Sequence, residues 1–449
     1  MEDSHLKRSI GLPGAVFILV GYIVGASIYI LPGTLGATAG PGVFVSYLLA
    51  SVLAIFTCFV TAQVGSAFPT SGANYVAISR VLSPFWGYMF IWALIACMGV
   101  GLPLIAYGFA EYLSFFIPVK SPMLVAAVIM LLFTGVNLLG VEVAKWIQAI
   151  MVVEFIAALL IFAVVGLFNL DNDLLTPVFP AGFGAVVMMA IPAYFSFVGF
   201  FMIAEIGEEI KNPSRNIPRA LLISFVVVVI VYTIVPLVVT GVLPWETLGG
   251  TKGAVAVASN VFFPKWLANI IAISALFAVA TSINGIIVAQ ARDFFAVARD
   301  GVFPSIFSRV SKRFSAPYWA ILLAGGIALV GILFGASIQN YAIMTVLGFM
   351  IIQILAGLAV LNLPKRLPDR YKEAKFKLKG FALPFFSIGL IVVSVVFIVI
   401  GIEQSLISAL IYLAFVALGA VGYVLRKRIL EKQGQKLEEM LTKDLSDIL

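Results

Sequence analysis

Long apolar stretches recur from one end of this chain to the other, and they constrain its fold more than any other feature. A helix of about 20 apolar residues crosses the hydrocarbon core of a bilayer. The chain is 62% hydrophobic and only 11% charged, too few charges to cover a water-soluble surface. We therefore predict an all-α integral membrane protein with twelve transmembrane helices. They lie at about 11–37, 42–65, 84–115, 121–140, 144–169, 183–206, 219–243, 263–297, 317–335, 340–362, 381–402 and 404–425.

The distribution of basic residues orients these helices. If the N-terminus is cytoplasmic, 25 of the 28 Lys and Arg residues fall on the inner side, and only Lys120, Lys252 and Lys265 fall outside. Such an excess inside predicts that both termini are cytoplasmic in a multi-pass protein of the cytoplasmic (plasma) membrane. The net charge of +7 is explained by basic loops, 365–380 above all, on anionic lipid. Membrane lipid is thus an expected partner, and nucleic acid is not.

The residues that usually carry catalysis or bind metals are scarce in the predicted spans. Cys58 and Cys97 lie singly inside spans, and the only histidine, His5, lies in the N-terminal tail. We therefore expect no enzyme activity, no bound metal and no cofactor beyond a coupling ion, H⁺ or Na⁺.

Two of the predicted spans are interrupted near their middle. LVGYIVGASIYILPG (19–33) carries Gly25-Ala26-Ser27, and AYFSFVGFF (193–201) follows Pro192 and contains Gly199. The odd number of five spans between them predicts an inverted repeat. The chain then reads as one transporter domain, 1–449, with repeats 11–169 and 183–362, two further helices in 381–425 and a cytoplasmic tail, 426–449. Taken singly, either glycine-containing helix is explained equally well by close helix packing.

A break in a membrane helix frees backbone N–H and C=O groups, and each costs several kcal/mol if it stays unpaired. The N-terminus of the following half-helix attracts a carboxylate. The carbonyl groups of the preceding half accept hydrogen bonds from an ammonium group. Two such breaks therefore favour a zwitterionic ligand.

Four stretches resemble one transporter family: GYIVGASIYILPG (21–33), FPTSGANYVAISR (68–80), FSFVGFFMIAEIGEEIKNPSRNIPRA (195–220) and ARDFFAVARDGVFPSIF (291–307). They are similar to the amino acid–polyamine–organocation (APC) superfamily, amino acid permease type. The resemblance implies a LeuT-type 5+5 inverted repeat with discontinuous helices 1 and 6. It also implies secondary active transport of amino acids by alternating access.

The same resemblance implies roles for individual residues. The substrate carboxylate is expected at the backbone of Gly25, Ala26 and Ser27, and the amino group at the second break, with Phe195 as the closing aromatic ring. The expected substrate-binding residues are Ile23, Gly25, Ala26, Ser27, Phe195, Ser196, Phe197, Val198 and Gly199.

The chain departs from the family pattern at two places. Phe201 stands where many cation-carrying members have Glu, which favours a neutral substrate. Phe155, with Glu154 before it, stands where several members have Lys. A cationic amino acid or polyamine exchanger stays open as an alternative, and so does an amino acid sensor that does not transport. Symport and exchange, and monomer and homodimer, also stay open.

Three residues are candidates for binding the coupling ion. Glu154 lies in mid-span, where an acid costs about 2.5–3.5 kcal/mol, so it is a candidate proton carrier. Thr281 and Ser282 are candidate sodium ligands, although hydroxyls in a span more commonly bond to their own helix backbone. Near the end of the sixth span, Glu208 and Glu209, together with Lys211, Arg215 and Arg219, are expected to form a solvated ion-pair network with Arg80 or Arg299.

Overall fold

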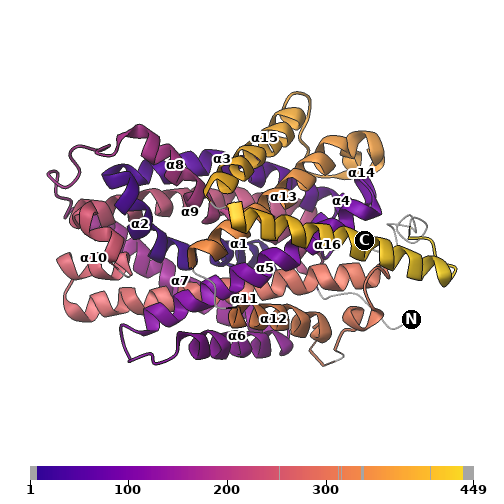
Figure 1. The fold of residues 1–449 in the computed structure, drawn as a ribbon, viewed down its shortest axis with the longest axis horizontal. Coiled ribbons are helices and arrows are strands. Elements are labelled where there is room, and N and C mark those ends of the chain that lie inside the picture. The colour runs from indigo at the N-terminus through magenta and orange to yellow at the C-terminus, as the bar shows by residue number, and fades with distance from the viewer. Residues whose placement is uncertain are drawn as a thin grey trace.

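The computed structural model describes residues 8–251, 253–311, 313–314, 316–334, 338–404 and 406–437. These residues form helices and two isolated bridges, packed as an elongated bundle along the long axis (Figure 1). The α-helices are α1 Leu12–Ile23, α2 Ala26–Ala39, α3 Val43–Ala67, α4 Ala73–Val81, α5 Pro84–Leu113, α6 Pro122–Leu138, α7 Val141–Leu167, α8 Gly182–Phe195, α9 Pro213–Val242, α10 Ala254–Phe262, α11 Lys265–Arg299, α12 Tyr318–Leu333, α13 Ile338–Arg366, α14 Pro368–Glu373, α15 Ala382–Gln404 and α16 Leu406–Lys432. The 3₁₀ helices are η1 Gly40–Gly42, η2 Val198–Glu205, η3 Gly207–Glu209, η4 Trp245–Gly250 and η5 Ser305–Ser308.

Length and composition make much of this bundle able to cross a bilayer. Within the described part of the chain, nine helical segments meet both criteria, and one of them, Leu12–Ala67, contains α1, α2, η1 and α3. The apolar helices α6 and α12 are shorter. Helices α7, α15 and α16 expose large apolar side chains. Helices that face lipid need such side chains, because lipid tails are apolar and water is absent there. The protein is therefore a multi-pass membrane protein.

Both predicted helix breaks are present. α1 ends at Ile23 and α2 begins at Ala26, with Gly25 in a non-helical conformation (φ −117°, ψ −144°). The break is one residue earlier than predicted, because Ala26 and Ser27 already belong to the first turn of α2. The second break follows Phe195, where α8 gives way to η2, a 3₁₀ helix of eight residues. A 3₁₀ run of that length is uncommon and often marks a hinge.

Short helices and helix starts differ from the prediction. α4, α10 and α14 lie in stretches that were expected to be loops, because helices of 9, 9 and 6 residues fall below the length of a span. α4 and α14 lie at one end of the bundle and α10 at the other (Figure 1). α9 begins at Pro213, the first helical position that suits proline, and thus before the predicted start of this span at about 219.

Three ion pairs form a layer at the α4 end. We call Arg80, Glu208, Glu209, Arg292, Arg299 and Asp300 the ion-pair layer. Arg80 donates to both Asp300 oxygens (2.5 and 2.8 Å), Arg292 donates to Glu209 (2.7 Å), and Arg299 donates to Glu208 (3.2 Å). The layer thereby joins α4, η3 and the end of α11.

The expectation of a solvated network is wrong for Glu208, Glu209, Arg80 and Arg299, whose side chains are at most 13% exposed. The Arg292 and Glu209 side chains are each 1% exposed, because α11 and its neighbours cover them. Lys211, Arg215 and Arg219, by contrast, are exposed.

Removing one charge of the buried pair should destabilise the fold. Glu209→Gln leaves the Arg292 guanidinium buried without its counter-charge, which costs about 3–5 kcal/mol. We expect a clearly lower thermal midpoint in detergent. The control is Asp369→Asn, at an ion-pair carboxylate that is 88% exposed. Equal midpoints for the two variants would contradict a buried, structural ion pair.

Candidate functional site: a cavity between the two helix breaks

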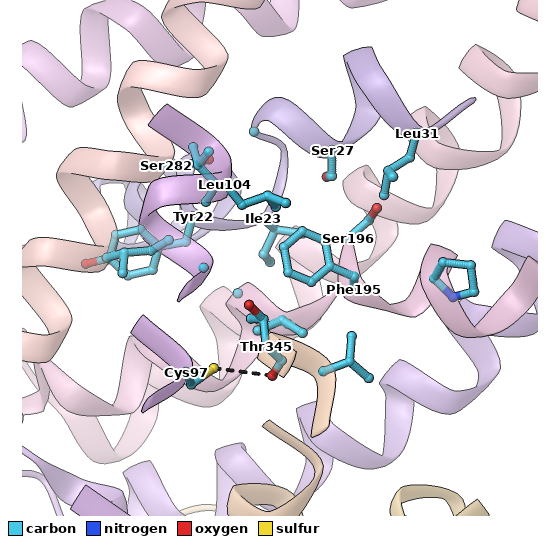
Figure 2. A pocket seen from close by; sticks show the side chains of 18 of the residues that line it. Tyr22, Ile23, Ser27, Leu31, Cys97, Leu104, Phe195, Ser196, Ser282 and Thr345 are labelled. Atoms are coloured by element: carbon cyan, nitrogen blue, oxygen red, sulfur yellow. Dashed lines mark hydrogen bonds between the residues drawn. The ribbon is translucent and has the colours of Figure 1, made fainter. Parts of the chain in front are cut away.

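The two breaks open onto one cavity of about 160 Å³. Its walls come from α1, α2, α5, α8, η2, α11, α13 and α15, and none of the described residues that line it is charged. In Figure 2, the Phe195 ring lies in the middle of the view beside Ile23, with Ser196 to one side and Thr345 below. The cavity therefore offers apolar walls, hydroxyl groups and the backbone of two interrupted helices.

The first break places the N-terminus of α2 at the cavity. α2 has no side-chain cap, so the backbone N–H groups of its first turn are available to a ligand. Gly25 and Ser27, which flank this turn, both line the cavity. Any Cβ on residue 25 would lie 1.7 Å from Ser282 Oγ, so only glycine fits against α11 here.

The second break supplies carbonyl groups and an aromatic ring. Phe195 ends α8, and Ser196 and Phe197 separate it from η2. Gly199 lets η2 lie against the end of α1, because a Cβ there would come within 2.8 Å of the Tyr22 carbonyl. The two broken helices therefore meet directly at their breaks.

Tyr232 of α9 holds the two breaks together. Its buried hydroxyl lies 2.5 Å from the Ile23 carbonyl and 3.2 Å from the Ser196 carbonyl, and also 3.3 Å from Ser27 Oγ. Sequence reasoning missed this residue. The available signal was a single tyrosine hydroxyl in an otherwise Val- and Ile-rich span, where a polar group needs a partner.

The structure brings most of the predicted substrate-binding residues together. The cavity is lined by the predicted residues Ile23, Gly25, Ser27, Phe195, Ser196, Val198 and Gly199. Two others are placed differently. Ala26 contributes its backbone at the start of α2, and the Phe197 ring packs edge-on against Tyr232, 5.1 Å between centroids. The Phe201 ring lies among Phe90 and Phe349, outside the cavity wall.

Of the three coupling-ion candidates, Thr281 and Ser282 lie together on α11, and Glu154 lies on α7. Ser282 lines the cavity, and its hydroxyl and that of Thr281 both donate to the Ala278 carbonyl, at 3.2 and 2.8 Å, the back-bonding named as the commoner role. Glu154 lies on α7, outside the cavity wall, half-buried and with no described partner for Oε2. Its described electrostatic neighbour is Tyr29 on α2.

The far wall of the cavity was not predicted. It comes from α5 and α13, which contribute Cys97, Met98, Gly101, Leu104 and Thr345 among others. Cys97 Sγ donates to the Thr345 carbonyl at 3.4 Å (Figure 2). In sequence these residues are ordinary members of apolar spans, so nothing in their pattern distinguishes the face that lines a cavity from the face that packs.

The fit of Gly25 against α11 can be tested without a ligand. Gly25→Ala forces its Cβ into Ser282, and we expect a lower thermal midpoint in detergent. Adding Ser282→Gly removes both clashing atoms and leaves the Ala278 carbonyl as the next neighbour, at 3.3 Å, so part of the midpoint should return. Gly250→Ala, with no atom within 4 Å of its Cβ, is the control. A Gly25→Ala variant as stable as the control would contradict this contact.

Comparison with known proteins shows which family the chain belongs to. Residues 10–421 match the amino acid permease family model. The chain is 27% identical to the branched-chain amino acid permease BcaP of Bacillus subtilis, over 96% of each chain. It is 26% identical to the methylthioribose transporter of the same species, over 95% of each. It is also 27% identical to cationic amino acid transporter 3, mitochondrial, of Arabidopsis thaliana, over 80% of this chain and 63% of the relative. The chain belongs to the amino acid permease family.

Proposed function

We propose that the protein is a secondary active transporter of amino acids, neutral ones with apolar side chains in particular, across the cytoplasmic membrane. It works by alternating access, as a symporter driven by H⁺ or Na⁺ or as an exchanger. The observation that carries the proposal is a single uncharged cavity lined by two helix breaks of opposite polarity.

The two breaks are suited to the two charges of an amino acid. The uncapped first turn of α2 supports the carboxylate there, because free N–H groups and the positive end of the helix dipole both attract an anion. The Ser196 carbonyl, at the second break, supports the ammonium group there. Because the lining carries no formal charge, this recognition depends on backbone groups and on the hydroxyls of Ser27, Ser196 and Thr345.

The rest of the cavity favours an apolar side chain. A cavity of about 150 Å³ lined by Leu, Ile and Phe binds benzene, and this one is of similar size. A cationic side chain would be buried there without a counter-charge, which is costly. The similarity to a branched-chain permease supports this choice, whereas the similarity to cationic transporters supports the alternative.

The fold that we propose is the LeuT-type repeat with twelve spans. Counting Leu12–Ala67 as two crossings and adding α6 and α12 to the nine candidate segments gives that number. The α4 end, with its basic residues, is then the cytoplasmic end. The two repeats then cross the membrane in opposite directions. In this arrangement, paired broken helices form a site at mid-membrane.

Counterflow in proteoliposomes tests the function. Vesicles loaded with unlabelled leucine should take up labelled leucine transiently, because exchange needs no coupling ion. Isoleucine and valine outside should compete, and arginine and putrescine should not. Vesicles without the protein, and vesicles with the protein but without internal leucine, are the controls.

Each contrary result has a definite meaning. Competition by arginine or putrescine alone would contradict the neutral substrate and favour the cationic or polyamine exchanger. Saturable leucine binding in detergent without counterflow would contradict transport and favour a sensor.

Tyr232 should act as a positioning residue. Tyr232→Phe leaves buried carbonyls without their donor, at a cost of about 1–3 kcal/mol. We expect the KM for leucine in counterflow to rise about tenfold while the protein stays monodisperse. The control is Tyr412→Phe, since the Tyr412 hydroxyl is buried with no hydrogen-bond partner among the described residues. An unchanged KM in Tyr232→Phe would show that the two breaks do not depend on this hydroxyl.

A further inference from the structure

A pair of buried carboxyl groups lies between the cavity and the ion-pair layer. Glu205 ends η2, and Asp293 lies on α11; each is 1% exposed. The two side chains interact electrostatically, and Asn74 of α4 donates its amide N–H to Glu205 Oε1. Gly72 lies between the two residues, since its N–H donates to the Glu205 carbonyl at 3.0 Å and a Cβ on it would lie 3.5 Å from Asp293 Cα. Two ionised carboxylates buried side by side would repel each other and lose their hydration, so this arrangement favours a proton on one of the two groups.

The site holds further polar atoms without partners. Glu205 Oε2 and Asp293 Oδ1 are buried and meet no donor among the described residues. Gln290, one turn before Asp293 on the same face of α11, is 1% exposed, and neither atom of its amide group has a described partner. Buried polar groups in this state are rare and call for an explanation, such as an exchangeable proton.

Both elements that carry the pair continue from the cavity wall. Gly199 and Met202 line the cavity, and Glu205 is the next residue in the same row, because side chains three apart eclipse in a 3₁₀ helix. On α11, Ser282 and Ile286 line the cavity. Gln290 and then Asp293 follow at helical spacing on that face. A movement that opens the seam between η2 and α11 would therefore reach the cavity and the pair together.

Among the described residues, the basic side chains around the pair are either paired with other carboxylates or exposed. The three arginines of the ion-pair layer each bind a carboxylate of that layer. α3 carries no charged side chain, and Arg215 and Arg219 of α9 are exposed. Other titratable side chains on neighbouring elements have described neighbours of their own: Tyr22 interacts with Arg292 and Glu209, Glu154 with Tyr29, and Tyr75 with Arg80 and Asp300.

We propose that Glu205 and Asp293 form a proton-binding site, which holds one shared proton while the α4 end is closed and releases it to water when η2 and α11 separate there. With the proton the pair carries one negative charge, and after release it carries two. Two bare carboxylates in contact repel each other and lose their hydration, so closure requires that a proton be taken up again. The proposal rests on the transport function proposed above, since a substrate cycle then carries one proton.

Accumulation driven by a pH gradient tests the pair. At zero membrane potential, one proton carried with each zwitterion concentrates labelled leucine about tenfold for each pH unit of gradient. We expect this of the wild type and of the exposed control variants Glu246→Gln and Asp173→Asn. We expect Glu205→Gln and Asp293→Asn to keep counterflow, which shows that they are folded, but to reach an accumulation ratio of about one.

Several results would overturn the proposal. Accumulation by both pair variants at the wild-type ratio, or loss of accumulation only in Glu154→Gln, would show that the pair does not carry the proton. Accumulation driven by sodium rather than by pH would also contradict the proposal. So would loss of counterflow in both variants while they remain monodisperse. The last would assign the pair to folding alone.

A second readout does not depend on transport. Infrared spectra at neutral pH should contain a protonated-carboxyl band that shifts in D₂O, changes in both pair variants and persists in Glu246→Gln. If leucine counterflow fails but this band is present, the proposed function is wrong and the proton site stands. If the band is missing from the wild type, the proton site is wrong.

Discussion

The two helix interruptions, held against each other by the Tyr232 hydroxyl, are the constraint on which the rest of the structure depends. Unpaired backbone groups at membrane depth are too costly to leave without partners. In this fold the two breaks pack against neighbouring elements: Gly25 lies against Ser282, and Gly199 lies against the end of α1. Gly25, Ser196 and Gly199, at the two breaks, line one shared cavity, where we propose that a zwitterion binds.

The charged residues are arranged at a distance from that cavity. Arg292 and Glu209 are fully buried, yet they pair with each other at the α4 end and leave the cavity lining uncharged. The order along η2, η3 and α11 is thus cavity wall, carboxyl pair, ion-pair layer. Because η2 with η3 and α11 contribute residues to all three levels, separating η2 from α11 at the α4 end would affect all three.

The sequence predicts the broken helices well, because Gly25, Pro192 and Gly199 are local signals of interrupted helix. It also places seven of the predicted substrate-binding residues in the cavity wall. It could not place Glu205 against Asp293, because 88 residues separate the two and neither has a local motif. Nor could it tell which of two adjacent residues faces the cavity: Phe197 turns towards Tyr232, whereas Ser196 and Val198 line the cavity. Facing depends on tertiary packing, which periodicity does not contain.

The most direct test of the central claim is an experimental structure with leucine bound. The account predicts the carboxylate at the first-turn N–H groups of α2, the ammonium group at the Ser196 carbonyl, and the side chain against Phe195 and the α5 wall. Leucine bound outside this cavity, or bound with its two charged groups exchanged, would contradict it.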